Sequence, residues 1–453
     1  MKNILIAIRS IFKKGRHNVM KIVSLGIGLA VGLVLIAKVY FEQSYDDFYP
    51  DRDRVYQVWA KYQQNGGELK DYPQTSGGIA PTMQQQIPEI ETVTRYTSFG
   101  DWTFTMTDTK MKYSGRCIIA DSCFFDILPR PMLIGNAKEV LSTPMYVLIS
   151  SRIAKNIGGD VIGKNFTVDS SPGRTMTIGG VFEEVPENSH SRYDVIVSMA
   201  SAGRFMWEGS PTNMLGNDRY ISYVKLHKGV NPLALEEQVH TFVNSYFPPE
   251  EQQKTGFNIG FSFHELDGLH KELPQVKRMT WILSLLAFAL IFTAVMNYIL
   301  IVISSIVNRS KEVAVHKCYG ASENNIHGMM FGEALVHIVL SLILALLLIL
   351  AFRGTVEELL ATSLDSLLLS NGSLVLLGIC ILVFFVSGFM PGSLYARIPV
   401  ASAFRNYREN KRIWKKALLL VQFVATGFLV TMLVFVARQY TFMVNDRPVY
   451  AYE

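Results

Sequence analysis

The sequence predicts an α-helical membrane protein with about five transmembrane helices and a large α+β extracytoplasmic domain inserted between the first and second spans. Composition is the first observation behind this prediction. The 453 residues are 49% hydrophobic and only 18% charged, whereas an ordinary soluble domain carries about 25% charged residues. The second observation is the pattern of hydropathy, because the apolar residues gather in runs as long as the roughly 20 residues that cross a bilayer.

Five apolar runs are long enough to be membrane spans. They cover residues 22–41, 281–305, 334–352, 373–391 and 415–436. The first run is too long and too rich in glycine for the apolar region of a signal peptide, so we expect it to be retained. Lys38 and Glu333 lie near the expected span ends, from which their charged groups can reach the membrane surface. His337 is expected in the first turn of the third span.

Basic residues predict the orientation of these spans. They gather before the first span, between the second and third, and between the fourth and fifth, whereas the loop between the third and fourth is acidic. Loops rich in Lys and Arg remain on the cytoplasmic side. We therefore expect a cytoplasmic N-terminus, with residues 42–280 and the tail at 437–453 outside the cell membrane.

Two cytoplasmic segments flank the spans. Residues 1–21 are basic and carry apolar side chains at helical spacing, so we favour an amphipathic helix on the inner membrane face over a plain basic leader. Residues 401–414 form a basic linker before the last span.

The segment 42–280 is large enough to fold around its own core. Asn65-Gly66-Gly67 predicts a hairpin turn between two strands. Residues 175–182 and 220–226 have strand patterns, and residues 79–87 and 233–247 have helical patterns. Together these predict an α+β domain.

The sequence has none of the common catalytic motifs. It contains no G-x-x-x-x-G-K-[ST], no G-x-S-x-G and no H-E-x-x-H, so we expect no enzyme activity, no metal site and no cofactor. The acidic residues at 46–53 are interrupted by arginines, which favours a solvated turn over a calcium site. Four cysteines do not make a disulfide framework. Only Cys117 and Cys123 could pair outside, and we favour two free thiols.

The charged stretch after the second span is the most informative part of the sequence. Residues 309–322 read R-S-K-E-V-A-V-H-K-C-Y-G-A-S. Gly320 predicts a turn, and Ser322 stands where it can cap a new helix. The stretch resembles the signature R-x-K-E-x-x-x-x-K-x-x-G-A-S of FtsX/MacB-type ABC transporter permeases. The resemblance continues in order along the chain, at residues 41–48, 53–58, 121–125, 162–164, 180–182, 186–190 and 388–391, although Gly392 stands where alanine is expected.

The resemblance implies a domain organisation and a site. Residues 42–280 would be a MacB-like extracytoplasmic domain and residues 281–400 an FtsX-like transmembrane domain. Within the latter, the loop 309–326 would couple the chain to a separate cytoplasmic ABC ATPase subunit that binds the ATP. The coupling residues implied are Arg309, Lys311, Glu312, Lys317, Gly320, Ala321, Ser322 and Glu333.

The resemblance also implies a function. The chain would be a non-catalytic permease subunit in a bacterial inner membrane, transmitting ATP-driven motion of the ATPase to the outside domain for efflux or for lipoprotein or peptide handling. The alternative is a peptide-sensing or cell-envelope signalling subunit of the same architecture. Expected partners are membrane lipid, the ATPase, a second permease half in a dimer or pseudo-dimer, and a periplasmic adaptor, but no nucleic acid. The substrate stays open.

A weak internal repeat bears on the length of the chain. Residues 39–56 and 435–450 each pair the end of a span with an aromatic-Gln pattern and a D-R-(P)-V-Y run. Internal repeats are common in transporters. We therefore expect this chain to be the N-terminal half of a longer two-repeat member.

Overall fold

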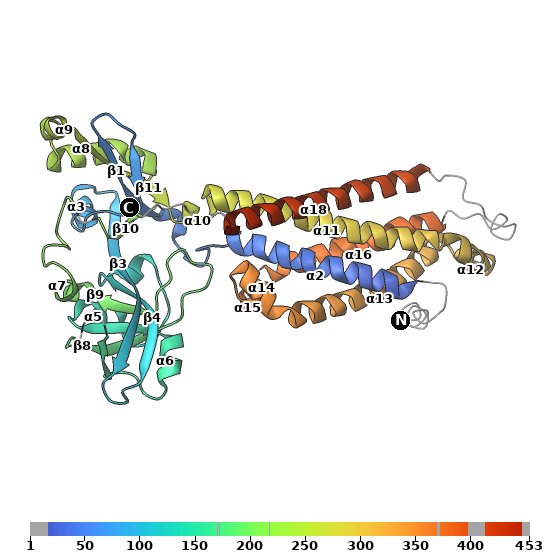
Figure 1. Ribbon diagram of the computed structural model, residues 1–453, viewed down its shortest axis with the longest axis horizontal. Coiled ribbons are helices and arrows are strands. Elements are labelled where there is room, and N and C mark those ends of the chain that lie inside the picture. The colour runs from blue at the N-terminus through green and yellow to red at the C-terminus, as the bar shows by residue number, and fades with distance from the viewer. Residues whose placement is uncertain are drawn as a thin grey trace. The chain divides into compact units, whose positions relative to one another are not determined.

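The computed structural model describes residues 17–169, 171, 173–216, 218–368, 372–396 and 413–445. The chain divides into two compact units (Figure 1). A globular unit comprises Ser44–Leu273, and a helical unit comprises Met1–Gln43 with Pro274–Glu453. The predictions for residues 1–16, for most of the linker 401–414 and for most of the tail 437–453 fall outside the described residues.

The globular unit is built on one mixed sheet. Its path runs β11-β1-β10-β3-β4-β9-β6-β8-β5, with β2 beside β1 and β7 between β3 and β8. The pairs β4–β9 and β6–β8 are parallel, and the other pairs are antiparallel. The strands are β1 (Val55–Gln64), β2 (Lys70–Tyr72), β3 (Ile90–Met106), β4 (Lys112–Ala120), β5 (Met132–Ile134), β6 (Tyr146–Ser150), β7 (Asn165–Val168), β8 (Thr175–Phe182), β9 (Val195–Ser198), β10 (Ile221–Leu226) and β11 (Phe257–Glu265).

Short helices bury apolar side chains against this sheet. One core lies where α3 and α8 pack on β1, β10 and β3, and its largest fully buried side chain is Phe242. Two further cores surround Phe166 and Phe124. The helices are α3 (Ile79–Gln86), α4 (Phe124–Ile127), α5 (Ala137–Ser142), α6 (Ser151–Ile157), α7 (Ala202–Phe205), α8 (Glu236–Tyr246), α9 (Pro249–Thr255) and α10 (Gly268–Lys271).

The predicted α+β character of this region is confirmed. The hairpin turn joins β1 to β2, with Asn65 and Gly66 at positive φ angles of 48° and 71°. The predicted strands at 175–182 and 220–226 correspond to β8 and β10, and the predicted helices correspond to α3 and α8. Local patterns were sufficient here because turn chemistry and side-chain alternation agree with the tertiary packing.

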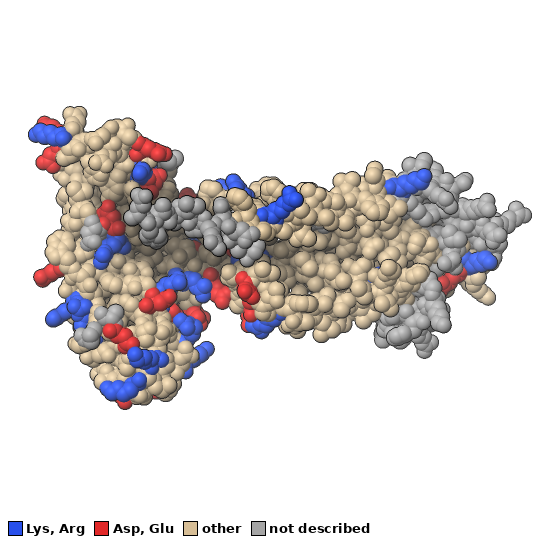
Figure 2. Space-filling view, in the orientation of Figure 1, with Lys and Arg blue, Asp and Glu red and all other residues tan. Residues whose placement is uncertain are grey.

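The helical unit contains, among the described residues, five helices long and apolar enough to cross a membrane. Figure 2 shows that charged side chains gather on the globular unit and leave the middle of the helical unit almost bare. The long helices are α2 (Asn18–Gln43), α11 (Pro274–Ser304), α13 (Glu323–Ala351), α16 (Ser373–Ala396) and α18 (Ile413–Asn445), and the shorter ones are α12 (Ile306–Cys318), α14 (Arg353–Leu360) and α15 (Leu364–Leu368).

Two predicted span boundaries need correction. The helix expected from residue 281 begins at Pro274, and the helix expected from residue 334 begins at Glu323. Hydropathy detects only the apolar part of a helix. Polar residues extend a helix freely where proline or a capping side chain fixes its first turn, as Pro274 and Ser322 do here.

Glycines bring α2 into close contact with α11 and α13. A Cβ added at Gly28 would overlap Ala294 of α11, and one at Gly26 would lie 2.9 Å from the Leu344 side chain of α13. Gly28 and Gly32 form a G-x-x-x-G pair, the spacing that lets apolar helices approach closely in membranes. The position of α2 between its two neighbours therefore depends on the absence of side chains on these faces.

We expect Gly28→Ala to destabilise the helical unit, because the new methyl group forces α2 and α11 apart. Overpacking of this kind costs about 1–3 kcal/mol. The measurement is the thermal unfolding midpoint of the purified chain in detergent, which should fall. Gly378→Ala in α16 is the matched control, because an added Cβ there meets nothing within 4 Å. Equal midpoints for the two variants would contradict the packing argument.

Candidate functional site

The candidate coupling element is α12 together with the turn that follows it and the first turn of α13. It begins where α11 breaks at Ser305, whose hydroxyl donates to the Val302 carbonyl at 2.6 Å. The hydroxyl of Tyr395 from α16 donates to the same carbonyl at 3.1 Å. Tyr395 is fully buried, so α16 holds the break in one geometry and sets the direction of α12.

A Schellman motif ends α12. The amide of Ala321 donates to the His316 carbonyl and the amide of Gly320 donates to the Lys317 carbonyl, both at 3.0 Å. Gly320 has a φ of +85°, the left-handed conformation that glycine adopts without a steric penalty. Ser322 then accepts the Asn325 amide at 3.3 Å and caps α13. The predicted turn and the predicted cap are both confirmed.

One face of α12 is packed and the other is open. Val313 and Ala314 are 1% exposed and belong to the core of the helical unit. Lys311 is exposed, and Val315 and Tyr319 show 43% and 88% of their surfaces to solvent. An exposed aromatic beside apolar and basic side chains is typical of a surface that a partner protein covers.

The predicted coupling residues do not all lie in this element. The residues Lys311, Glu312, Lys317, Gly320, Ala321 and Ser322 belong to α12 and its turn, and only the side chain of Arg309 lies outside the described part. The segment 309–326 was predicted as a loop, and this is wrong: most of it is helix, because the charged residues continue the turn of α11 after its one-residue break.

Glu333 lies elsewhere. It sits ten residues beyond Glu323, about 15 Å along α13, is 6% exposed, and approaches Lys21 of α2 at 3.7 Å. Lys38 is also buried, pairing with Glu42 at 2.6 Å and donating to Thr362 at 2.8 Å. The expectation that Lys38 and Glu333 reach the membrane surface is therefore wrong, because partners within the bundle neutralise both.

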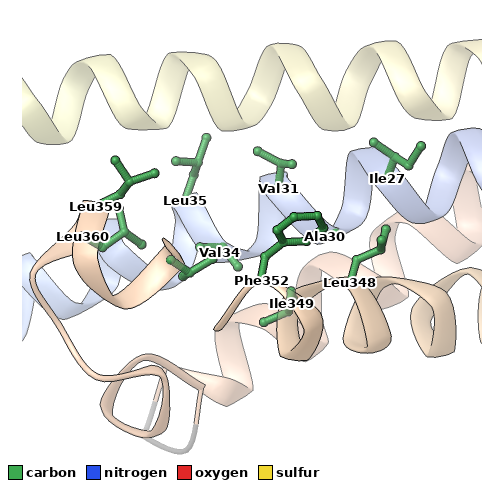
Figure 3. Close-up of a pocket in the computed structure, with 11 residues that line it drawn as sticks. Ile27, Ala30, Val31, Val34, Leu35, Leu348, Ile349, Phe352, Leu359 and Leu360 are labelled. Atoms are coloured by element: carbon green, nitrogen blue, oxygen red, sulfur yellow. The ribbon is translucent and has the colours of Figure 1, made fainter. Parts of the chain in front are cut away.

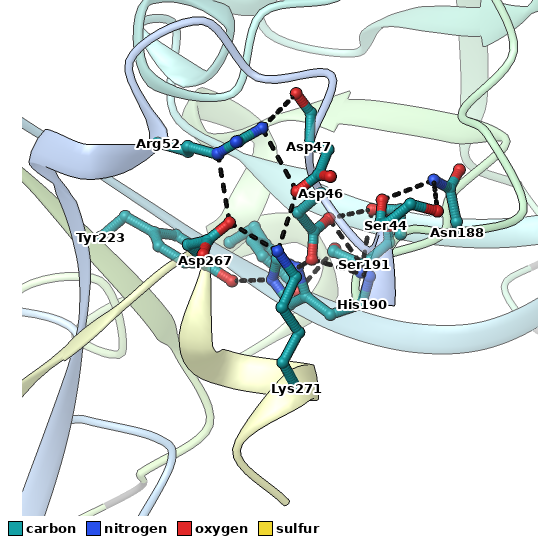
Figure 4. Close-up of polar contacts among 12 residues, drawn as sticks. Ser44, Asp46, Asp47, Arg52, Asn188, His190, Ser191, Tyr223, Asp267 and Lys271 are labelled. Atoms are coloured by element: carbon teal, nitrogen blue, oxygen red, sulfur yellow. Dashed lines mark hydrogen bonds and ion pairs between the residues drawn. The ribbon is translucent and has the colours of Figure 1, made fainter. Parts of the chain in front are cut away.

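A second polar cluster lies in the globular unit, where the chain arrives from α2 (Figure 4). Asp46 is 1% exposed and has a φ of +59°. Its carboxylate accepts from the Ser189 hydroxyl at 2.9 Å and from Nδ1 of His190 at 2.7 Å. Since a carboxylate only accepts, Nδ1 of His190 donates this bond, and Nε2 lies 2.5 Å from the Tyr223 hydroxyl. This chain of bonds, the Asp46 latch, fixes the incoming segment to the loop 186–191.

Burial governs the tyrosines behind the Asp46 latch. It raises the pKa of Tyr96 to about 12 and holds the pKa of Tyr223 well above its usual value. Both phenols therefore remain protonated at neutral pH. Tyr223 can donate to His190, and Tyr96 accepts from the Ser191 hydroxyl at 2.7 Å.

Four charged residues beside the latch form a ring of alternating sign. Arg52 bonds to Asp47 at 3.2 Å and to Asp267 at 3.1 Å, and Lys271 bonds to both carboxylates at 2.8 Å. Asp47 precedes β1, whereas Asp267 and Lys271 follow β11, so this ionic ring joins the incoming and outgoing segments of the globular unit. Partial burial acts to lower the pKa of Lys271, but its bonds to the two carboxylates outweigh this and raise it.

Asp46 is thus paired with His190, and Asp47 and Asp267 are paired with Arg52 and Lys271. In the described part of the chain no group of three or more His, Cys, Asp or Glu side chains is arranged to hold a metal ion. Cys117 and Cys123 are free thiols, as predicted.

The helical unit also carries an apolar groove of about 390 Å³ (Figure 3). Ile27 and Val31 of α2 line one side, and Phe352 and Leu359 line the other. Every lining side chain is apolar, so the groove can accommodate a hydrocarbon chain and provides no polar group for chemistry.

These features define a multi-pass membrane protein with one large inserted domain. The helical unit has five apolar helices, the mixed-sheet unit is inserted after the first of them, and the break and turn follow the second. Residues 284–400 match the family described as FtsX-like permease C-terminal. A solved domain from a Porphyromonas gingivalis protein named as a permease is 33% identical, with coverage of 48% of this chain and 91% of that one and a TM-score of 0.44. The family match assigns residues 284–400 of this chain to the FtsX-like permease domain.

Two further solved structures are similar to this chain at lower identity. The periplasmic region of MacB from Actinobacillus actinomycetemcomitans is 16% identical, covering 49% of this chain and 92% of its own length, with a TM-score of 0.31. The extracellular domain of the ABC-type transporter YknZ from Gram-positive bacteria is 10% identical, with coverage of 46% and 98% and a TM-score of 0.33. No curated protein matched.

Sequence reasoning missed several residues of the site. Tyr319 and Tyr395 are ordinary aromatics in sequence, and only packing reveals that one is exposed and the other buried. The sequence did point to the histidine of the latch, because His190 is the last residue of the segment 186–190 that resembles the family. Its partner Asp46 lies in the segment 41–48 that also resembles the family, but no local pattern pairs it with His190.

We expect Asp46→Asn to loosen the incoming segment. Asparagine tolerates the positive φ but cannot supply the charged acceptor, and leaving buried donors without it costs about 1–3 kcal/mol. Hydrogen exchange followed by mass spectrometry should show faster exchange at residues 44–50 and 186–191. Asp169→Asn is the control, because that exposed carboxylate accepts from Lys112 and Thr105 on the surface. Unchanged exchange in Asp46→Asn would show that the latch does not hold the segment.

Proposed function

We propose that this chain is a non-catalytic permease subunit of an ABC transporter, which transmits ATP-driven motion of a separate ATPase to its globular unit. The coupling element is the observation that carries the proposal. Its direction is set by buried Tyr395, its turn is set by Gly320, and its open face presents Lys311, Val315 and Tyr319. A rigid element with an exposed apolar and basic face is what a soluble ATPase needs in order to push on a membrane subunit.

The route from this element to the globular unit runs through packed helices. The turn at Gly320 leads directly into α13, which packs along α2. The chain continues from α2 into Ser44 and then into the Asp46 latch. The outgoing segment is tied to the incoming one by the ionic ring, so that movement of α2 is passed to both segments that support the sheet.

The distribution of Lys and Arg along the sequence supports the proposed orientation of the permease in the membrane. Along the sequence, basic residues gather before the first span, between the second and third, and between the fourth and fifth, which supports a cytoplasmic coupling element and a globular unit outside a bacterial inner membrane. The sequence has no P-loop, which is why the ATP must be bound by a partner.

We expect Glu312→Lys to abolish stimulation of the ATPase by the reconstituted permease. Reversing a charge in a buried contact between proteins costs about 2–5 kcal/mol, which is enough to displace the docked subunit. Glu358→Lys is the matched control, because Glu358 is an exposed glutamate on α14, which begins at the opposite end of α13. Full stimulation by the Glu312 variant would remove the coupling assignment.

We expect native Cys318 to react with a membrane-impermeant maleimide only after spheroplasts are permeabilised, because it is exposed on the coupling element. A Thr109→Cys variant should be labelled in intact spheroplasts, since Thr109 is exposed in the β3–β4 turn. The reverse pattern would overturn the proposed orientation.

A further inference from the structure

Three polar side chains form a buried stripe along one face of α13. Glu333, His337 and Ser341 follow one another at intervals of four residues, which aligns them on one side of a helix. They are 6%, 1% and 0% exposed. His337 was expected in the first turn of a span, but α13 begins fourteen residues earlier, at Glu323, and His337 lies inside the bundle.

Each member of this stripe contacts a neighbouring helix. Glu333 approaches Nζ of Lys21 on α2 at 3.7 Å. The ring nitrogen Nδ1 of His337 lies 3.1 Å from the Tyr298 hydroxyl of α11. Ser341 donates to the Ile22 carbonyl of α2 at 3.1 Å. The stripe therefore alternates between α2 and α11 along about 12 Å of α13.

These contacts are not explained by the need to associate apolar helices. Glycine packing already brings α2 against α11 and α13, and apolar side chains would fill the same positions at no electrostatic cost. Ionisable groups in membrane helices are expensive and mark function by default. The polar side chains add contacts of fixed direction. A hydrogen bond or ion pair fixes the rotation and register of one helix against another, whereas apolar packing tolerates sliding.

We propose that Lys21, Glu333, His337, Tyr298 and Ser341 are positioning residues that lock α13 to α2 and α11, so that displacement of the coupling element moves α2 as one body with α13. The assignment rests on the proposed coupling function. Lys21 lies in the first turn of α2, with its ammonium also 3.1 Å from Asn18 Oδ1. The lock thus acts near the start of the helix whose other end continues into the Asp46 latch.

The central test uses the double variant K21M/E333Q, which removes both charges and leaves neither uncompensated. The permease is reconstituted with the ABC ATPase that copurifies with it and is compared without nucleotide and with ATP plus vanadate. Hydrogen exchange at residues 44–50 reports movement passed to the globular unit. We expect K21M/E333Q to keep stimulating the ATPase and to lose the nucleotide-dependent difference in exchange, and the charge-swapped K21E/E333K to regain it.

Matched variants separate positioning from general damage. K38M/E42Q removes a buried pair within α2 and the Lys38 bond to Thr362, neither of which involves α11 or α13, so it should retain the nucleotide-dependent difference. Y298F/S341A removes two hydroxyls with little change in volume and should reduce that difference with the unfolding midpoint preserved, which provides a test if K21M/E333Q is not produced.

The outcomes distinguish this inference from the function on which it rests. A wild-type exchange difference in K21M/E333Q or in Y298F/S341A overturns the lock, as does an equal loss in K38M/E42Q. Loss of ATPase stimulation in K21M/E333Q also counts against it, because the pair would then act in docking. If Glu312→Lys keeps both stimulation and the exchange difference, the coupling function itself is wrong.

Discussion

Close packing of α2 between α11 and α13 is the constraint on which the helical unit depends. Within a bilayer no hydrophobic force draws helices together, so association relies on small residues that let the backbones approach closely. The glycines of α2 supply this close approach, and the polar stripe on α13 adds contacts of fixed direction. The two are linked, because only the close approach at Gly26 and Gly28 allows Lys21 to reach Glu333 and Ser341 to reach the Ile22 carbonyl.

The globular unit uses two kinds of connection at the point where the chain enters and leaves it. The Asp46 latch is buried, so its hydrogen bonds are strong and insensitive to salt. The ionic ring is partly exposed, and single exposed ion pairs contribute about 0–1 kcal/mol and are screened by salt. A buried attachment of the incoming segment is thus combined with a weaker, salt-sensitive link to the outgoing segment.

The geometry of the candidate coupling element rests on few contacts. It comes from backbone hydrogen bonds, one buried tyrosine and one glycine with a positive φ. The exposed face carries Tyr319 and Val315, and side chains of this kind contribute contact area where proteins bind one another.

The sequence by itself determined the class of protein, the five apolar helices, the mixed α and β character of the inserted unit, the turn at Gly320 and the cap at Ser322. These are local properties, set by hydropathy, backbone conformation and capping within a few residues. The tertiary structure alone decided that the predicted loop is mostly helix, that Tyr319 is exposed, and that Tyr395 is buried. It also decided that Asp46 pairs with His190 and that Glu333 pairs with Lys21. These pairs join residues 144 and 312 positions apart. No local pattern encodes such a partnership, because it arises only when packing brings two distant segments together and burial then requires each polar or charged group to find a partner.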